Sequence, residues 1–376
     1  MYRPNTLWSW SFLALAFIQS CIVLACEGYV FARYQENLIP NHIDALSNLK
    51  EANRQNQEFL YQIDFTQAQP RTIPTYLTLF IFAHVFLVVL CYDALRLKNT
   101  IQVIGICIFN LAMLVYAAIQ MDQIRDANDA LKKPLVEGQD LQKKEIWSDI
   151  KPFLITIPCV IALSSMIMFF VAWKLYDEFA WKIYKHISAD LRMKKRYLTF
   201  QIFIALLKFD FFFFVGFTIQ FIVIVAATSG YSEHEVDGRD YEFYVTIAAL
   251  PVTILFLVLA AWCTRREKLY PMYAAVTLFF AALAYFIFKL VRMFQKDYEQ
   301  SFKPARRSLT TFAVITILLI VLTIGNAVAC MMNFNKGLKP HITKRKVNDD
   351  DDKNSISLEM THPHSAQPVP SRMTID

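Results

Sequence analysis

Long apolar stretches recur along this chain, and they constrain the fold more than any other feature. They are about 20 residues long, which is what a helix needs to cross roughly 30 Å of hydrocarbon at 1.5 Å per residue. Because lipid offers no water to backbone amides and carbonyls, such stretches must be helical. Strands of a membrane barrel are about 10 residues long and alternate in polarity, unlike these segments. The sequence therefore predicts an all-α fold, a polytopic transmembrane helix bundle.

Eight spans are predicted, and a chain of seven spans with one non-crossing segment is the alternative. Composition agrees with a membrane protein, because 56% of the 376 residues are hydrophobic and only 19% are charged. A soluble domain of this size would need more polar surface. The approximate bounds of the spans are Trp8–Val30, Ile73–Leu95, Ile101–Gln120, Phe153–Trp173, Leu198–Thr228, Tyr244–Cys263, Tyr270–Leu290 and Leu309–Met332.

Residues 1–335 are expected to form one transmembrane helical domain with two long polar loops, at 31–72 and 121–151. Both loops are rich in helix formers, so we expect them to extend their spans beyond the bilayer. Pro134 and Gly138 predict a break in the second loop. Residues 336–376 pass from a basic cluster to four aspartates and then to serine, proline and histidine. This composition predicts a disordered cytosolic tail.

Basic residues at the span ends predict the orientation. The segment "KLYDEFAWKIYKHISADLRMKKRY" is basic, the next connection "SGYSEHEVDGRDYE" is acidic, and "TRREK" follows. This order places both termini in the cytosol and the two long loops outside. The basic connection "VRMFQKDYEQSFKPARRS" lies outside in this orientation and does not fit the rule. The lipid bilayer is the expected partner, with anionic headgroups at the cytosolic basic segments. Because the basic residues lie at membrane edges, the net charge of +6 does not indicate nucleic acid.

One apolar stripe follows span four and has two interpretations. It is either an amphipathic helix on the cytosolic membrane surface or an extension of span four that packs on neighbouring helices. Its members recur every four residues: Leu175, Phe179, Ile183, Ile187 and Leu191.

Two charged residues interrupt the fifth span, in "LLKFDFFFFVGF". Lys208 and Asp210 are two positions apart, about 200° around a helix, so they cannot pair with each other. In the predicted orientation Asp93 lies near the depth of Lys208, and we expect a contact between them. His84, midway in span two, is a candidate neighbour of Asp210. Alternatively, both charges of span five sit at the headgroup level and Lys208 extends to the interface.

Other polar residues within the spans are predicted to hydrogen-bond neighbouring helices rather than to bind a ligand. Glu27 ends span one, where an interfacial carboxylate is ordinary. The set comprises Gln19, Glu27, Asn110, Ser164, Ser165, Gln220 and Asn326.

Catalytic and metal-binding patterns are missing from the sequence. There is no phosphate-binding glycine-rich loop, no H-E-x-x-H and no G-x-S-x-G. The seven cysteines fall within or at the ends of apolar segments, which argues against a disulfide-bonded ectodomain. We predict neither enzymatic activity, nor a cofactor, nor a metal site.

Three stretches of the C-terminal half resemble a known family. They are "ADLRMKKRYLTFQIFIALLKFDFFFFVGFTIQFIVIV", "REKLYPMYAAVTLFFAALAYFIFKLVRM" and "RRSLTTFAVITILLIVLTIGNAVACMMNFNKGLKPH". They resemble an uncharacterised family of fungal multi-pass membrane proteins of the Golgi apparatus. The resemblance covers about residues 188–341 and implies a location and a fold type, without catalytic residues.

Three functions are compatible with these features. The first is a non-enzymatic role in Golgi or endomembrane trafficking or organisation, through the tail and the cytosolic basic helix. The second is a transporter or channel for a small solute or ion that uses Lys208, Asp210, Asp93 and His84. The third is a seven-span-like receptor with an atypical eighth segment.

Overall fold

The computed structural model describes residues 6–38, 57–132, 146–186, 191–228, 236–295 and 306–336. Within these ranges every regular element is an α-helix. The expected break at Pro134 and Gly138 and the expected tail after Lys336 lie outside the described residues. The helices are α1 (Leu7–Leu38), α3 (Gln57–Arg96), α4 (Thr100–Lys132), α5 (Ile146–His186), α6 (Leu191–Thr228), α7 (Val236–Arg266), α8 (Leu269–Met293) and α10 (Arg306–Met332).

Each of these helices contains an apolar window long enough to cross a membrane. The prediction of eight spans is confirmed on the described residues, in which eight helices are long and apolar enough to cross a membrane. Several helices also continue past their apolar windows. For example, α1 runs to Leu38, α3 already begins at Gln57, and α4 runs to Lys132. The polar loops therefore extend the spans, as their helix-forming composition predicted.

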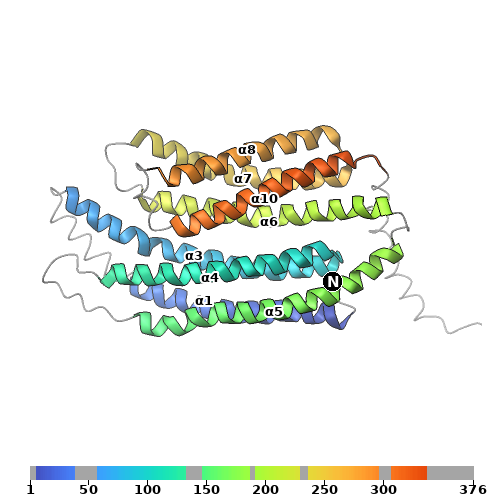
Figure 1. Cartoon of the computed structure of the whole chain (residues 1–376). Coiled ribbons are helices and arrows are strands. Elements are labelled where there is room, and N and C mark those ends of the chain that lie inside the picture. Colours follow the sequence, from blue (N-terminus) through green and yellow to red (C-terminus); the bar gives the residue numbers. More distant parts are fainter. Residues whose placement is uncertain are drawn as a thin grey trace, which may run out of the picture.

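The helices form two bundles of four, stacked side by side (Figure 1). In the N-terminal bundle, α1 packs on α3 and α5, and α4 also packs on α3 and α5. In the C-terminal bundle, α10 packs on α6 and α8, and α7 also packs on α6 and α8. Each bundle thus has an up-and-down arrangement in which sequential helices are neighbours and the last returns to the first.

The two bundles meet where α3 and α4 face α6, with α10 touching α4. Phenylalanine rings fill this interface: the centroids of Phe109 and Phe212 are 5.0 Å apart, and those of Phe86 and Phe212 are 5.3 Å apart. Two glycines make room for such rings. A Cβ atom on Gly105 would lie 2.6 Å from Phe209, and one on Gly216 would lie 2.7 Å from Phe312. The interface therefore depends on the absence of side chains at two positions.

We call one end of the molecule the basic end. It holds the start of α1, the α3–α4 turn, the α7–α8 turn, the facing ends of α5 and α6, and the end of α10. Figure 1 shows α5 and α6 extending past the α3–α4 turn there. Because α5 continues unbroken to His186 with Leu175 and Phe179 buried, the first part of the apolar stripe extends span four. Ile187 lies outside the described residues, and Leu191 begins α6. The loop end is the opposite end of the bundle.

Candidate functional site

The tight turn between α3 and α4 positions the side chains of Asp93 and Gln102, which accept hydrogen bonds from a positively charged group. After Arg96, Lys98 takes a left-handed backbone conformation with φ 46°, and Asn99 then caps α4. The Asn99 Oδ1 atom accepts hydrogen bonds from the amides of Ile101 and Gln102 at 3.1 and 3.3 Å, as a good N-cap residue does. The hairpin therefore holds the last turn of α3 against the first turn of α4.

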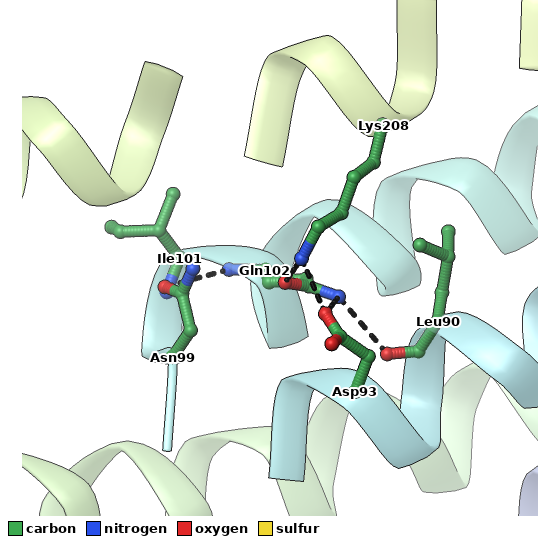
Figure 2. A network of polar contacts seen from close by, with 6 residues as sticks. All are labelled: Leu90, Asp93, Asn99, Ile101, Gln102 and Lys208. Carbon is green, nitrogen blue, oxygen red and sulfur yellow. Dashed lines mark hydrogen bonds and ion pairs between the residues drawn. The ribbon is translucent and has the colours of Figure 1, made fainter. Parts of the chain in front are cut away.

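Asp93 and Gln102 lie on this hairpin and contact each other. The Gln102 Nε2 atom donates to Asp93 Oδ2 at 3.0 Å and to the Leu90 carbonyl at 3.1 Å. These two bonds fix the amide so that its oxygen, Oε1, faces away from α3 (Figure 2). A carboxylate and an amide oxygen are thus presented together on the C-terminal bundle side of the hairpin.

Lys208 of α6 binds both acceptors (Figure 2). Its Nζ atom donates to Asp93 Oδ2 and, at 2.7 Å, to Gln102 Oε1. The Lys208–Asp93 contact expected from their similar depth is present in the structure. The Lys208 side chain is 24% exposed and that of Asp93 is 35% exposed, so this ion pair is only partly shielded. It joins the N-terminal bundle to the C-terminal bundle near the basic end.

Asp210 faces the inside of the C-terminal bundle and is fully buried. Its Oδ2 atom accepts a hydrogen bond from the Thr323 hydroxyl of α10 at 2.7 Å. Its Oδ1 atom is buried without a hydrogen-bond partner. Asp210 and Lys208 thus face different neighbours, and both bond to helices rather than extending outward from α6.

His84 does not contact Asp210, so this predicted pairing is wrong. The His84 ring lies against Phe80 with centroids 4.7 Å apart, and its Nδ1 atom is 3.1 Å from the Phe80 carbonyl. Its Nε2 atom has no partner. Asp93 and Lys208 are in contact and so lie at the same depth. At 1.5 Å per residue, His84 lies further from this contact along the bundle axis than Asp210 does, by about 10 Å. The four predicted residues therefore form one ion pair and two separate buried groups.

Most of the other polar residues of the spans bond between helices, as predicted, whereas burial alone is seen for Ser164. Gln19 and Asn110 exchange two hydrogen bonds, at 2.7 and 3.2 Å, and Asn110 also donates to Ser165 at 2.9 Å. One side chain thus connects α1, α4 and α5. Asn326 donates to the Thr199 carbonyl at 3.0 Å and connects α10 with α6.

A second set of polar contacts joins the bundles towards the loop end. Gln220 of α6 donates to the Tyr116 hydroxyl of α4 at 3.3 Å, and Ser308 of α10 donates to Gln220 Oε1 at 3.2 Å. The two bundles are therefore connected by polar groups on both sides of the phenylalanine interface.

Glu27 differs from the sequence interpretation as an interfacial carboxylate. It is only 1% exposed, and both of its carboxylate oxygens accept from Gln120 Nε2, at 3.0 and 3.2 Å. α1 continues past Glu27 to Leu38, and Val30 and Tyr34 are buried there, so the bundle still covers one face of α1 beyond Glu27.

Sequence reasoning missed Gln102, Tyr116 and Thr323, which are neutral partners of the predicted residues. A polar residue in an apolar span at the depth of a charge is a usable signal for Gln102 and Thr323. Tyr116 carried no such signal, since tyrosine is common in membrane helices.

Side chains typical of transition-metal sites do not cluster in the described part of the chain. No group of three or more His, Cys, Asp or Glu side chains converges there. A groove of about 550 Å³ lies between α1 and α3, and apolar atoms line nearly all of it. The lining residues are Trp10, Leu13, Ala14, Phe17, Val88, Val89 and Tyr92. Such a lining suits hydrocarbon chains rather than a polar solute.

The basic end brings together three chain segments that are distant in sequence. The Arg196 guanidinium at the start of α6 donates to the Lys336 carbonyl at 2.7 Å. The Asn335 amide, just after α10, donates to Glu267 Oε2 in the α7–α8 turn at 3.1 Å. These contacts gather eight basic residues, which we call the basic cluster: Arg192, Lys194, Lys195, Arg196, Arg265, Arg266, Lys268 and Lys336. All eight are exposed or half-exposed.

The chain is similar to a UPF0658 Golgi apparatus membrane protein of Schizosaccharomyces pombe. The two are 29% identical over 346 residues, which cover 88% of each chain. The chain resembles this family of fungal Golgi membrane proteins, as its C-terminal segments predicted. The similarity extends into the N-terminal bundle as well, because it covers 346 residues. No family model matches the chain, and no solved structure matches it.

The apolar helices and this similarity together establish the class of the protein. It is a multi-pass membrane protein of the Golgi apparatus or another endomembrane compartment.

Proposed function

We propose that this protein is a non-enzymatic organising component of Golgi membranes that holds anionic lipid headgroups at its basic end. One observation carries the proposal. Two contacts, Arg196 with Lys336 and Asn335 with Glu267, assemble three basic segments into one cluster on a single end of the bundle.

The charge of the basic cluster fits a phosphate-bearing headgroup. Lysine and arginine side chains near a membrane surface attract anionic lipids by about 1 kcal/mol each. Glu267, an acid in the α7–α8 turn, is buried and accepts a hydrogen bond from the Asn335 amide. It therefore adds no exposed negative charge to the basic cluster. The predicted orientation places this cluster in the cytosol, where the anionic leaflet lies.

The intramembrane polar residues support a structural rather than a catalytic role. Lys208 binds Asp93 and Gln102, Asp210 binds Thr323, and Asn110 binds Gln19 and Ser165. Each of these contacts connects two helices. The polar groups thus stabilise a fixed bundle on which the basic end is displayed.

Binding can be measured on the purified full chain in nanodiscs. The probe is a short-chain phosphatidylinositol phosphate, and the same inositol phosphate without acyl chains serves as a second probe. The test variant replaces Lys194, Lys195, Arg265, Arg266 and Lys268 by Gln. We expect the lipid probe to bind at least about ten-fold more weakly, because five positive charges near the headgroup are lost.

A matched control replaces Arg306 and Arg307 by Gln at the loop end and should bind like the wild type. Unchanged lipid binding by the test variant, or equal loss in both variants, contradicts the proposal. Tighter binding of the free inositol phosphate than of the lipid assigns the cluster to a soluble anion instead and also overturns it.

Transport of a small ion is the second candidate, because one observation favours it. Asp210 is fully buried and has one oxygen without a partner, which is typical of intramembrane ion or proton sites. Proton flux into reconstituted vesicles can be followed with a trapped pH-sensitive dye. If Asp210 carries the flux, Asp210→Asn and Lys208→Ala abolish it; flux that persists in both variants rejects this candidate.

A further inference from the structure

A second buried carboxyl group lies in the N-terminal bundle, far from the basic end. Glu27 is 1% exposed, and Gln120 donates to both of its oxygens. Arg33, the next basic residue on α1, bonds instead to Glu36 and Tyr29. Among the described residues, no ion pair to Glu27 is present. A buried carboxylate with only neutral partners is costly, so its charge calls for compensation.

Several polar atoms of α4, on Gln120 and one turn beyond it, are buried without partners. They are Gln120 Oε1 and both amide atoms of Gln123. The Tyr76 hydroxyl is also buried and has the Thr72 hydroxyl as its neighbour. These side chains are between 1% and 3% exposed, so bulk water does not reach them. An unpartnered buried polar group costs about 1–3 kcal/mol. Native proteins therefore fill such places with water or an ion.

The helices place Tyr76 at the depth of Gln120 and Glu27, and Gln123 about one turn further along α4. Gln120 and Gln123 are three residues apart and share a face of α4. Phe80 of α3 stacks on Tyr116 of α4, with centroids 5.7 Å apart. Because α3 and α4 run in opposite directions, Tyr76, one turn before Phe80, lies level with Gln120, one turn after Tyr116.

The chemistry of this group is that of a hard-cation site. A carboxylate, amide carbonyls and a phenol are oxygen ligands, which suit alkali and alkaline-earth cations. A single carboxylate neutralises one positive charge, whereas a divalent ion would retain a net charge inside the bundle. We propose that Glu27, Gln120 and Tyr76, with Gln123 beside them, bind a small monovalent cation of the sodium class.

This site goes beyond the proposed function and is independent of it. The basic cluster lies at the opposite end of the molecule, and no residue belongs to both. The proposal predicts that sodium stabilises the folded protein, because a ligand that binds only the native state raises its unfolding temperature.

The experiment uses the purified full chain in detergent at constant ionic strength. Thermal unfolding is measured while sodium chloride replaces N-methyl-D-glucamine chloride. We expect the unfolding temperature of the wild type to rise with sodium and to saturate. In Glu27→Gln, which retains the shape and the contact with Gln120, the rise should be absent. In Asp126→Asn, an exposed acid of α4, it should be unchanged.

Tyr76→Phe provides a milder variant that removes one oxygen and keeps the ring. It should raise the half-saturating sodium concentration on the order of ten-fold. Equal unfolding temperatures in sodium and N-methyl-D-glucamine overturn the proposal and leave water as the occupant. A sodium response that is as large in Glu27→Gln as in the wild type overturns it as well.

Discussion

The two bundles share one arrangement of helices but are held together by different means. In the N-terminal bundle, amide and carboxyl side chains connect α1, α4 and α5 at two depths, through Asn110 and Gln120. In the C-terminal bundle, the polar bonds of Asp210 and Asn326 join α6 to α10 only. Rings and close approach add to them: Phe217 and Phe286 have centroids 5.0 Å apart, and Gly216 lies against Phe312. The difference teaches that one topology can be stabilised in lipid by polar bonds or by packing.

Buried cysteines allow the stability of each bundle to be read separately. Cys91 and Cys107 are buried in the N-terminal bundle, and Cys263 and Cys330 are buried in the C-terminal bundle. A variant that lacks Cys21, Cys26 and Cys159 and keeps one of these pairs reports on one bundle. Labelling by a thiol-reactive dye during heating then gives the unfolding midpoint of that bundle.

The largest effect is expected for Asn110→Leu. It leaves the Gln19 amide without its partner inside the N-terminal bundle and removes the donor to the Ser165 hydroxyl, which keeps its bond to the Ile161 carbonyl. We expect a loss of about 2–3 kcal/mol in the free energy of unfolding, with earlier labelling of Cys91 and Cys107. The double variant Gln19→Leu/Asn110→Leu should recover part of the loss. An equal shift of the labelling midpoint in both cysteine pairs would show that the loss of the Asn110 bonds destabilises the two bundles alike.

A slightly smaller effect is expected for Gly216→Ala, because its new methyl group would lie 2.7 Å from Phe312. Overpacking of this kind costs about 2 kcal/mol. The Cys263 and Cys330 pair is the appropriate reporter. Gly325→Ala is the matched control, since nothing lies within 4 Å of a Cβ atom there. It should be neutral or stabilising by up to about 1 kcal/mol. Equal midpoints for the two variants would argue against close packing as the stabilising principle.

Lys208→Met tests the connection between the bundles. The ion pair with Asp93 is partly exposed, so we expect a cost of about 1–2 kcal/mol, between the values for surface and buried pairs. The midpoints of the two cysteine pairs should separate, because the bundles lose a shared contact. A double-mutant cycle with Asp93→Asn isolates the interaction energy. A coupling energy near zero would show that the Lys208–Asp93 ion pair does not stabilise the contact between the two bundles.

The smallest effect is expected at the two hairpin turns. Asn99 caps α4, whereas Lys268 precedes α8 without a side-chain cap bond. Asn99→Ala should cost about 1 kcal/mol and Asn99→Asp little. Lys268→Asn should stabilise α8 by up to about 1 kcal/mol, because its extended backbone suits a cap. The same thiol assay measures both variants. A loss of stability in Asn99→Ala and a gain in Lys268→Asn would confirm that only the first turn has a side-chain cap.

The helices were predictable because hydrocarbon imposes a length and a polarity on each span. The Lys208–Asp93 contact was also predictable, since a charge in an apolar span requires a partner at its own depth. His84 was misassigned although the predicted Lys208–Asp93 contact already separates it from Asp210 by about 10 Å along the axis. The sequence also does not say which neighbour a histidine faces. Glu27 was misread because the covering of α1 by other helices is a tertiary property, invisible in one span.

The ion pair between the bundles also has a consequence for the order in which the chain is made. The Asp93–Gln102 hairpin is synthesised about a hundred residues before Lys208. The acceptors of Lys208 are therefore already present in the membrane when α6 is inserted. The partner of Asp210, Thr323, is synthesised more than a hundred residues later. Integration of α6 is therefore assisted early at its lysine and completed only when the last helix is delivered.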